Sequence, residues 1–280
     1  MTETSVSVAI PSRITVEQRV RWAIADGFVV AHRNLLQFTR VPTLLVFSIV
    51  QPIMFVLLFR FVFGGAITDL PPGISYVNYL LPGIFVQTAI FGSTQTGIGL
   101  ATDLKSGLID RFRSLPMARS AVLAGRTTSD LVRNVVVVLL MIGVGYLVGF
   151  SFDNGLAAAI AAVLLSVLVG FAFSWVSATI GLAIKDVESV QAASFTWIFP
   201  LTFISSVFVV PATMGPVLQT IARNNPVTVW ANTVRALTIG AAALPPGESI
   251  TDLLAKSLAW IAAILIVFVP ISVRSYRRLT

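Results

Sequence analysis

Residues 41–63, VPTLLVFSIVQPIMFVLLFRFVF, decide the kind of fold that this chain adopts. The stretch holds a single charged residue, Arg60, and it is longer than the roughly 20 apolar residues that a helix needs to cross a bilayer. Pro52 in its interior is compatible with a transmembrane helix, because neighbouring helices and hydroxyl side chains can satisfy the backbone groups that proline frees. The stretch therefore predicts a membrane span.

Five further apolar stretches follow, at residues 79–101, 131–150, 156–183, 191–210 and 253–273. The whole chain is 56% hydrophobic and 11% charged, whereas a soluble domain carries about 25% charged residues. The sequence therefore predicts an all-α membrane protein with six transmembrane helices, in a single membrane domain at residues 41–280.

The basic residues are distributed unevenly between the loops. Residues 1–40, residues 102–130, Lys185 and the C-terminal tail together hold 14 Lys and Arg, whereas the opposite loops hold only Arg223 and Arg235. The positive-inside rule then places both termini in the cytoplasm. The rule also accounts for the net charge of +7, so nucleic acid is not an expected partner. Arg60, Arg133 and Lys256 fall near predicted span ends, from which they can snorkel to the membrane interface.

The segment before the first span, residues 1–40, is amphipathic. Its apolar residues recur at spacings of three and four and share one helical face. We expect a helix in the plane of the cytoplasmic interface, although this helix could also pack against the first span. The residues of its apolar face are Val20, Ile24, Phe28, Leu35 and Phe38.

Residues 211–252 are too polar and too interrupted to form a span. Apolar residues recur there at helical intervals on both sides of Asn225 and Pro226, a pair that stops one helix and starts another. The segment predicts two short re-entrant helices on the outer side of the membrane.

Several kinds of chemistry are excluded by composition. The chain has no Cys and one His, which excludes thiolate and His-cluster metal sites. It contains no phosphate-binding loop of the G-x-x-x-x-G-K-[ST] kind, and the middles of the predicted spans lack the ionisable residues that an ion-coupled transporter commonly uses. If the chain transports a cargo, the energy must come from another protein, and we expect no cofactor on this chain.

The loop at residues 102–130 contains a charged island, DLKSGLIDRFRSLPMARS at 103–120. A short helix is predicted from Asp103 to Ser114, with Pro116 ending it. Leu104, Leu108 and Phe112 would form an apolar ridge, and Gly107 would permit close approach of another chain. A ridge with a charged rim suits the docking of a partner protein, and a basic loop equally suits contact with acidic lipid head groups.

The sequence resembles the membrane permease subunit of ABC exporters of the type-2 class, especially the daunorubicin-resistance-type branch. Four segments carry the resemblance in order: QPIMFVLLFRFVFGGAI at 51–67, YLLPGIFVQT at 79–88, LKSGLIDRFRSLPMARSAVLAGR at 104–126 and NPVTVWANTVRALTIG at 225–240. The family often has Glu-rich sequence before the loop glycine, where this chain has Asp103 and Lys105. This departure leaves the charge pairing with a partner open.

The resemblance implies a permease of the bacterial cytoplasmic membrane that pairs with a second copy or a paralogue. It also implies two copies of a separate ABC ATPase, which would carry the ATP and Mg²⁺. The loop helix would be the coupling helix seated on the ATPase, and the helices around Asn225 and Pro226 would cap the exit. The expected coupling residues are Asp103, Leu104, Lys105, Gly107, Leu108, Asp110, Arg111, Phe112, Arg113 and Pro116.

Family cargoes are hydrophobic drugs, lipids, glycolipids or polysaccharides. We hypothesise a cargo path with an apolar and aromatic lining, and for each lining residue the alternative is ordinary packing. At the level of function, an ion-coupled secondary transporter and a non-transporting membrane scaffold remain alternatives. The candidate lining residues are Phe85, Gln87, Phe91, Gln95 and Trp197.

Overall fold

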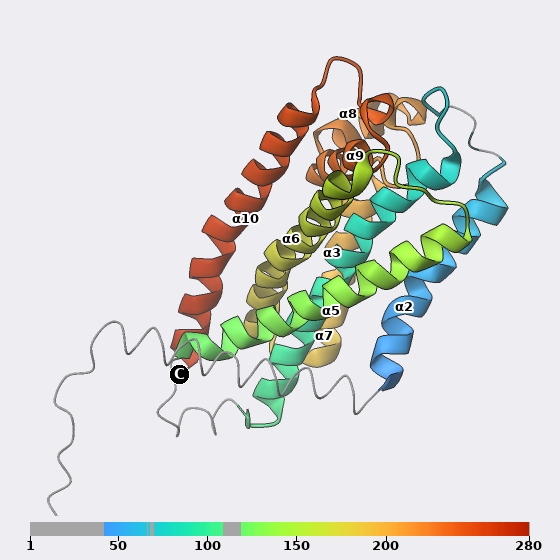
Figure 1. Cartoon of the computed structure of the whole chain (residues 1–280). Coiled ribbons are helices and arrows are strands. Elements are labelled where there is room, and N and C mark those ends of the chain that lie inside the picture. The colour runs from blue at the N-terminus through green and yellow to red at the C-terminus, as the bar shows by residue number, and fades with distance from the viewer. Residues whose placement is uncertain (1–41, 66, 68–69, 109–118, 280) are drawn as a thin grey trace, which may run out of the picture.

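The computed structural model describes residues 42–65, 67, 70–108 and 119–279, and every regular element within them is a helix. The helices lie side by side in a bundle, and shorter helices gather at one end of it (Figure 1). The long helices are α2 (Pro42–Leu57) with its π-helical continuation η1 (Leu58–Phe63), α3 (Tyr76–Lys105), α5 (Arg119–Leu147), α6 (Gly155–Ile184), α7 (Val187–Phe203) and α10 (Ile250–Leu279). The short helices are η2 (Pro211–Thr213), α8 (Pro216–Asn224), α9 (Pro226–Ile239) and η3 (Ala241–Ala243).

Each of the six predicted spans overlaps one of the long helices, although the fifth, at residues 191–210, extends beyond the end of α7 at Phe203. Among the described residues, three helices are long and apolar enough to cross a membrane: Leu123–Leu147, Gly155–Ile184 and Ile250–Arg278. The apolar helix at Ile49–Phe63 is shorter. The chain is therefore an all-helical, multi-pass membrane protein.

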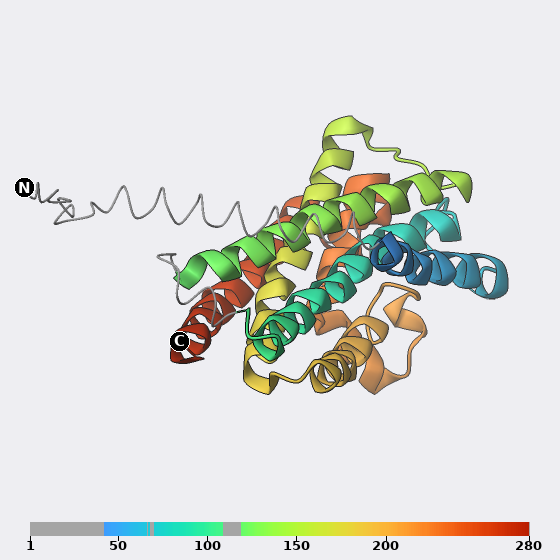
Figure 2. The ribbon, with the colours of Figure 1, turned by 90° about the horizontal axis from the view of Figure 1, so that it is seen from below.

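Helix α3 lies at the centre of the bundle. It packs most extensively against α6 and also contacts α5, α7 and α9, and the view along the bundle shows it between α5 and the α7 region (Figure 2). Small residues bring α3 and α6 together, because a Cβ on Gly181 would lie 2.4 Å from the carbonyl oxygen of Gly97. Small residues at a helix crossing allow such close packing inside a membrane.

The break at Asn225 and Pro226 separates α8 from α9. The Asn225 side chain caps α9 by accepting a hydrogen bond of 2.8 Å from the Val227 N–H. Its amide nitrogen also donates to the carbonyl oxygens of Leu201 and Ile204, at 2.7 and 2.6 Å. Asn225 therefore ties the start of α9 to the end of α7, in addition to interrupting the helix.

The helices on either side of the charged loop are longer than the predicted spans. Helix α3 continues through Lys105, and Gly107 then adopts a left-handed backbone with φ of 68°. Helix α5 begins at Arg119. Asp103 and Lys105 therefore lie in the last turn of α3, so a separate loop helix cannot begin at Asp103.

Two sets of predicted residues lie outside the described part of the chain. The first set is the apolar face of the N-terminal helix, Val20, Ile24, Phe28, Leu35 and Phe38. The second set is the distal part of the loop, which includes Asp110, Arg111, Phe112, Arg113 and Pro116.

The N-terminus of α7 is capped by an exposed carboxylate. The Asp186 side chain accepts a hydrogen bond of 2.9 Å from the Ser189 N–H at the start of α7. Hydrogen bonding from the Ser189 backbone and side chain lowers the pKa of Asp186, because the bonds favour the charged form. The preceding residue, Lys185, ends α6 in a left-handed conformation with φ of 65°.

Candidate functional site

A cleft of about 90 Å³ opens between α2, α3, α5 and α7. It combines aromatic rings with carboxamide and hydroxyl side chains and one guanidinium group. We refer to it as the central cleft. Its lining residues are Gln51, Pro52, Phe55, Gln87, Thr88, Phe91, Gly92, Thr94, Gln95, Arg133, Asn134, Val137 and Phe195.

Of the five residues that were expected to line a cargo path, three border the central cleft and two lie elsewhere. Gln87, Phe91 and Gln95, spaced four residues apart, lie on the face of α3 that borders the central cleft. Phe85 points elsewhere, because two residues turn a helix by about 200°, and its ring packs edge-on against Phe150 at 5.7 Å. Trp197 stacks on Phe173, also at 5.7 Å, and is not among the cleft residues.

Two amide side chains in the central cleft are buried without full hydrogen bonding. Gln87 and Asn134 are each 3% exposed. The Gln87 Nε2 and Asn134 Nδ2 atoms have no hydrogen-bond partner among the described residues. A buried polar group without a partner costs about 1–3 kcal/mol, so these amides have unused capacity to bind a polar group.

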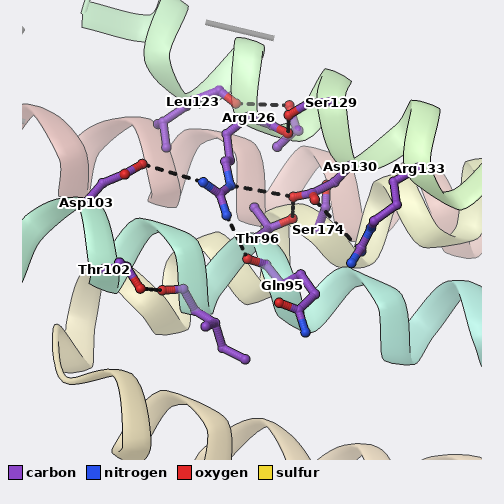
Figure 3. A network of polar contacts seen from close by, with 12 residues as sticks. Gln95, Thr96, Thr102, Asp103, Leu123, Arg126, Ser129, Asp130, Arg133 and Ser174 are labelled. Atoms are coloured by element: carbon purple, nitrogen blue, oxygen red, sulfur yellow. Dashed lines mark hydrogen bonds and ion pairs between the residues drawn. The ribbon is translucent and has the colours of Figure 1, made fainter. Parts of the chain in front are cut away.

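A network of ion pairs joins α3 to α5 beside the central cleft (Figure 3). Arg126 Nη1 lies 3.6 Å from Asp103 Oδ2, and Arg126 Nε lies 3.9 Å from Asp130 Oδ2. Arg133 Nη2 lies 3.8 Å from Asp130 Oδ1. We call these four residues the α3–α5 ion-pair network.

Hydrogen bonds to α3 complete the α3–α5 ion-pair network. Arg126 Nη2 donates to the Gln95 carbonyl oxygen at 3.3 Å. The Thr96 hydroxyl donates to the Asp130 carboxylate, and the Arg133 guanidinium donates to the Gly92 carbonyl oxygen. These charge-assisted bonds hold the two helices in a fixed register.

Two glycines on α3 make room for side chains of α5 in and beside the network. A Cβ on Gly99 would overlap the Arg126 guanidinium, and a Cβ on Gly92 would collide with the Asn134 side chain. The position of Arg126 therefore depends on the absence of a side chain at residue 99, and the position of Asn134, the neighbour of Arg133, depends on its absence at residue 92. The network extends from Asp103, in the last turn of α3 beside the charged loop, to Arg133 in the wall of the central cleft.

The prediction that Arg133 snorkels from a span end is wrong. Arg133 is 4% exposed and binds Gly92 and Asp130. Helix α5 begins at Arg119, well before the predicted span start at residue 131, so Asp130 and Arg133 lie near the middle of the helix. The missed signal is the spacing of Arg126, Asp130 and Arg133, which places three charges on one helical face.

Arg235, which the sequence places among the residues between the fifth and sixth predicted spans, is buried rather than exposed in a loop. Arg235 lies within α9 and is 1% exposed. Its guanidinium lies 3.7 Å from the centroid of the Tyr79 ring. It donates to the carbonyl oxygens of Tyr79 and Ser206 and to Asn232 Oδ1, at 2.8, 2.9 and 2.6 Å. The charge is thus held by carbonyl groups and an aromatic ring, and it connects α9 to α3 and to the segment after α7.

A run of aromatic rings leads away from the central cleft. Phe91 contacts Phe195 and Phe199 with centroid distances of 5.9 and 5.4 Å. The contacts continue from Phe199 to Phe203 at 5.5 Å and from Phe203 to Phe208 at 4.9 Å. We call these five residues the aromatic strip. It follows α7 toward the end of the bundle that holds α8 and α9 (Figure 1).

The described coupling residues lie at the end of α3. Leu104 packs against a cluster that includes Leu100 and Leu123, so it is partly committed to the interior. Lys105 is exposed. Gly107 lies in the turn after α3, and the next residue, Leu108, is helical. Among the described residues, no group of His, Cys, Asp or Glu side chains could hold a metal ion.

Comparison with known proteins agrees with this architecture. A family model described as ABC-2 type transporter matches residues 27–239. The chain is 33% identical over 276 residues to the daunorubicin resistance ABC transporter permease protein DrrB1 of Streptomyces coeruleorubidus, an alignment that covers 98% of this chain and 94% of the relative. It is 27% identical over 282 residues to the probable doxorubicin resistance ABC transporter permease protein DrrC of Mycobacterium tuberculosis, covering 99% and 98%. The chain therefore belongs to the ABC-2 type transporter family, as a membrane permease and not as an ATP-hydrolysing subunit.

Proposed function

We propose that this permease exports a hydrophobic or amphipathic cargo, such as a drug, a lipid or a glycolipid, across the bacterial cytoplasmic membrane. The observation that carries the proposal is the central cleft, which combines aromatic and amide side chains and is linked by ion pairs to the charged loop. The names of the relatives concern resistance to daunorubicin and doxorubicin, which supports amphipathic compounds as cargo. ATP and Mg²⁺ would bind to two copies of a separate ATPase subunit.

In the proposed topology, six helices span the membrane: α2 with η1, α3, α5, α6, α7 and α10. The end of α3 and the C-terminus of α10 lie at one end of the bundle, and α8 and α9 lie at the other (Figure 1). The distribution of Lys and Arg puts the first of these ends in the cytoplasm. Helices α8 and α9 would then be outer re-entrant helices that cap the exit, and residues 1–40 would hold the interface helix.

In the proposed mechanism, closure of the ATPase subunits pushes on the coupling loop, residues 102–130. The α3–α5 ion-pair network would make the two helices that flank this loop move as one body, because buried charged contacts are costly to break. A movement at Asp103 would then reach Arg133 in the wall of the central cleft. The movement of α3 and α5 relative to α2 and α7 would open or close the cleft.

A second permease, either another copy or a paralogue, would complete the cargo path. The central cleft holds about 90 Å³, whereas sites for drug-sized molecules hold about 300–1,000 Å³. One chain therefore has room for only part of such a cargo. The rest would lie between the two permeases or against the surrounding lipid.

The coupling role predicts a loss of ATPase binding when the loop charge is reversed. We expect the double variant Arg111→Glu and Arg113→Glu to abolish pull-down of the ATPase from detergent-solubilised membranes, since an opposite charge would repel the surface that accepts these residues. The variant should still insert into the membrane, as measured by its abundance in the membrane fraction.

The matched control reverses the charge of two arginines on the same side of the membrane but outside the loop, with Arg274→Glu and Arg278→Glu. We expect normal pull-down from this control. Unchanged pull-down from the loop variant would rule out the coupling role. Equal loss from both variants would show that net charge, and not the loop, governs the association.

A further inference from the structure

We infer that the central cleft binds an uncharged hydrogen-bonding group of the cargo, such as a hydroxylated or glycosyl head, while the apolar body of the cargo lies along the aromatic strip. The inference rests on the proposed function, because it specifies which class of amphipathic cargo the permease would accept. Gln87 is the residue that would determine this specificity.

The polar lining of the central cleft is dominated by neutral groups. Four carboxamides and two threonine hydroxyls contribute to it: Gln51, Gln87, Gln95, Asn134, Thr88 and Thr94. A carboxamide offers both donors and an acceptor, which matches a hydroxyl or amide group better than an ion. Gln87 is 3% exposed, and its Nε2 has no hydrogen-bond partner among the described residues, so a polar group of the cargo could complete its hydrogen bonding.

The charges beside the cleft favour neither an anionic nor a cationic head. Arg133 is the only charged residue among those that line the cleft, and it lies 3.8 Å from Asp130. The four members of the α3–α5 ion-pair network, two Asp and two Arg, carry no net charge together. An anionic head at Arg133 would also face Asp130, and a cationic head would face the guanidinium. Burial of a charge without a free counter-ion is unfavourable.

The size of the central cleft indicates that it would hold only the polar head of a drug-sized cargo, and that the apolar body would lie outside it. A cleft of about 90 Å³ accommodates a small polar head but not a drug-sized molecule. The aromatic strip begins in the cleft wall with Phe91 and Phe195. It continues to Phe199 and Phe203, which are 40% and 37% exposed. Exposed rings next to a polar cleft offer an apolar body a surface to pack on.

The test uses the full-length permease in phosphatidylcholine liposomes and three photoactivatable probes with identical diacyl chains. The heads are glucosyl, phosphoglycerol and trimethylammonium, which are neutral, anionic and cationic. Labelled peptides from α3, α5 and α7 are quantified by mass spectrometry. We expect saturable labelling of these helices by the glucosyl probe, and at least threefold weaker labelling by the two charged probes. Stronger labelling by either charged probe would overturn the inference.

The variant Gln87→Met keeps the length of the side chain and removes its hydrogen-bonding groups. We expect it to weaken binding of the glucosyl probe about three- to tenfold, the usual range for one hydrogen bond. The matched control is Gln191→Met, at an exposed position of α7 that is not among the cleft-lining residues, and it should bind normally. Gln95→Met is a second cleft variant. Because the Gln95 side chain is exposed, this substitution should not disturb folding. Normal binding by both cleft variants would contradict the inference.

Two further experiments extend the test. One distinguishes a lipid cargo from an aromatic compound, and the other distinguishes failure of the head-group inference from failure of the proposed export function. Replacing the diacyl chains by a pyrene body shows whether the neutral head can belong to an aromatic compound as well as to a lipid, and preference for the neutral head within either series supports the inference. Photolabelling needs no ATPase. Loss of the head preference with intact ATP-driven export would overturn the inference alone, and normal labelling without ATP-driven export would overturn the proposed function alone.

Discussion

Asp130→Ala is expected to lower the free energy of unfolding by about 3–5 kcal/mol, the usual cost of removing one partner from a buried ion pair. Asp130 is 2% exposed and is the carboxylate that both Arg126 and Arg133 approach, at 3.9 and 3.8 Å. Its removal would leave the facing guanidinium groups without their shared counter-ion between α3 and α5. The measurement is unfolding of the permease in mixed detergent micelles, followed by tryptophan fluorescence.

Asp153→Ala is the matched control for this prediction. Asp153 is exposed in the segment between α5 and α6, so its loss should change the unfolding free energy by less than about 0.5 kcal/mol. If Asp130→Ala unfolds at the same detergent concentration as the control, the α3–α5 ion-pair network does not hold the two helices together. The proposed rigid coupling of these helices would then fail as well.

Arg235→Met is expected to destabilise the bundle by about 3–5 kcal/mol, because hydrogen bonds from a charged donor are lost and their buried acceptors are left unsatisfied. The substitution keeps an unbranched side chain but removes hydrogen bonds to Tyr79, Ser206 and Asn232, and bonds to a charged donor contribute about 1.5–3 kcal/mol each. It also removes the stacking of the guanidinium on the Tyr79 ring. Loss of these contacts should release α9 from α3, which can be measured as faster proteolysis after α9 in addition to earlier unfolding.

The neighbouring helix provides the control for this second prediction. Arg223 lies in the last turn of α8 and is exposed, so Arg223→Met should leave unfolding and proteolysis unchanged. Equal behaviour of Arg235→Met and Arg223→Met would show that the buried arginine contributes nothing to the position of α9.

The apolar runs predicted the positions of the long helices because a span needs an unbroken length of apolar side chains. The Asn225–Pro226 pair predicted the break between α8 and α9, because the residue before a proline is disfavoured in a helix. Helix ends were less predictable. Helix α5 starts twelve residues before its predicted span at residue 131, because polar residues such as Asp130 can remain helical when another helix supplies their partners.

The central cleft could be predicted only in part. The spacing of Gln87, Phe91 and Gln95 places them on one face of a helix, and this face borders the cleft. The partners of that face come from α2, α5 and α7, which are distant in sequence. Arg235 shows the same limit, because its partners Tyr79 and Ser206 lie far from it in the chain. A count of loop charges cannot reveal a buried arginine that is satisfied by carbonyl groups.

The central claim is that this permease moves an amphipathic cargo with energy from a separate ATPase. The most direct measurement reconstitutes the permease with its ATPase in liposomes and follows movement of the three diacyl probes, with and without ATP and Mg²⁺. The account predicts ATP-dependent movement of at least one probe, which requires both proteins and is lost with Arg111→Glu and Arg113→Glu. Transport by the permease alone, driven by a proton gradient without any ATPase, would contradict the account and favour a secondary transporter. If none of the three probes moved in an ATP-dependent manner, the result would favour a membrane scaffold.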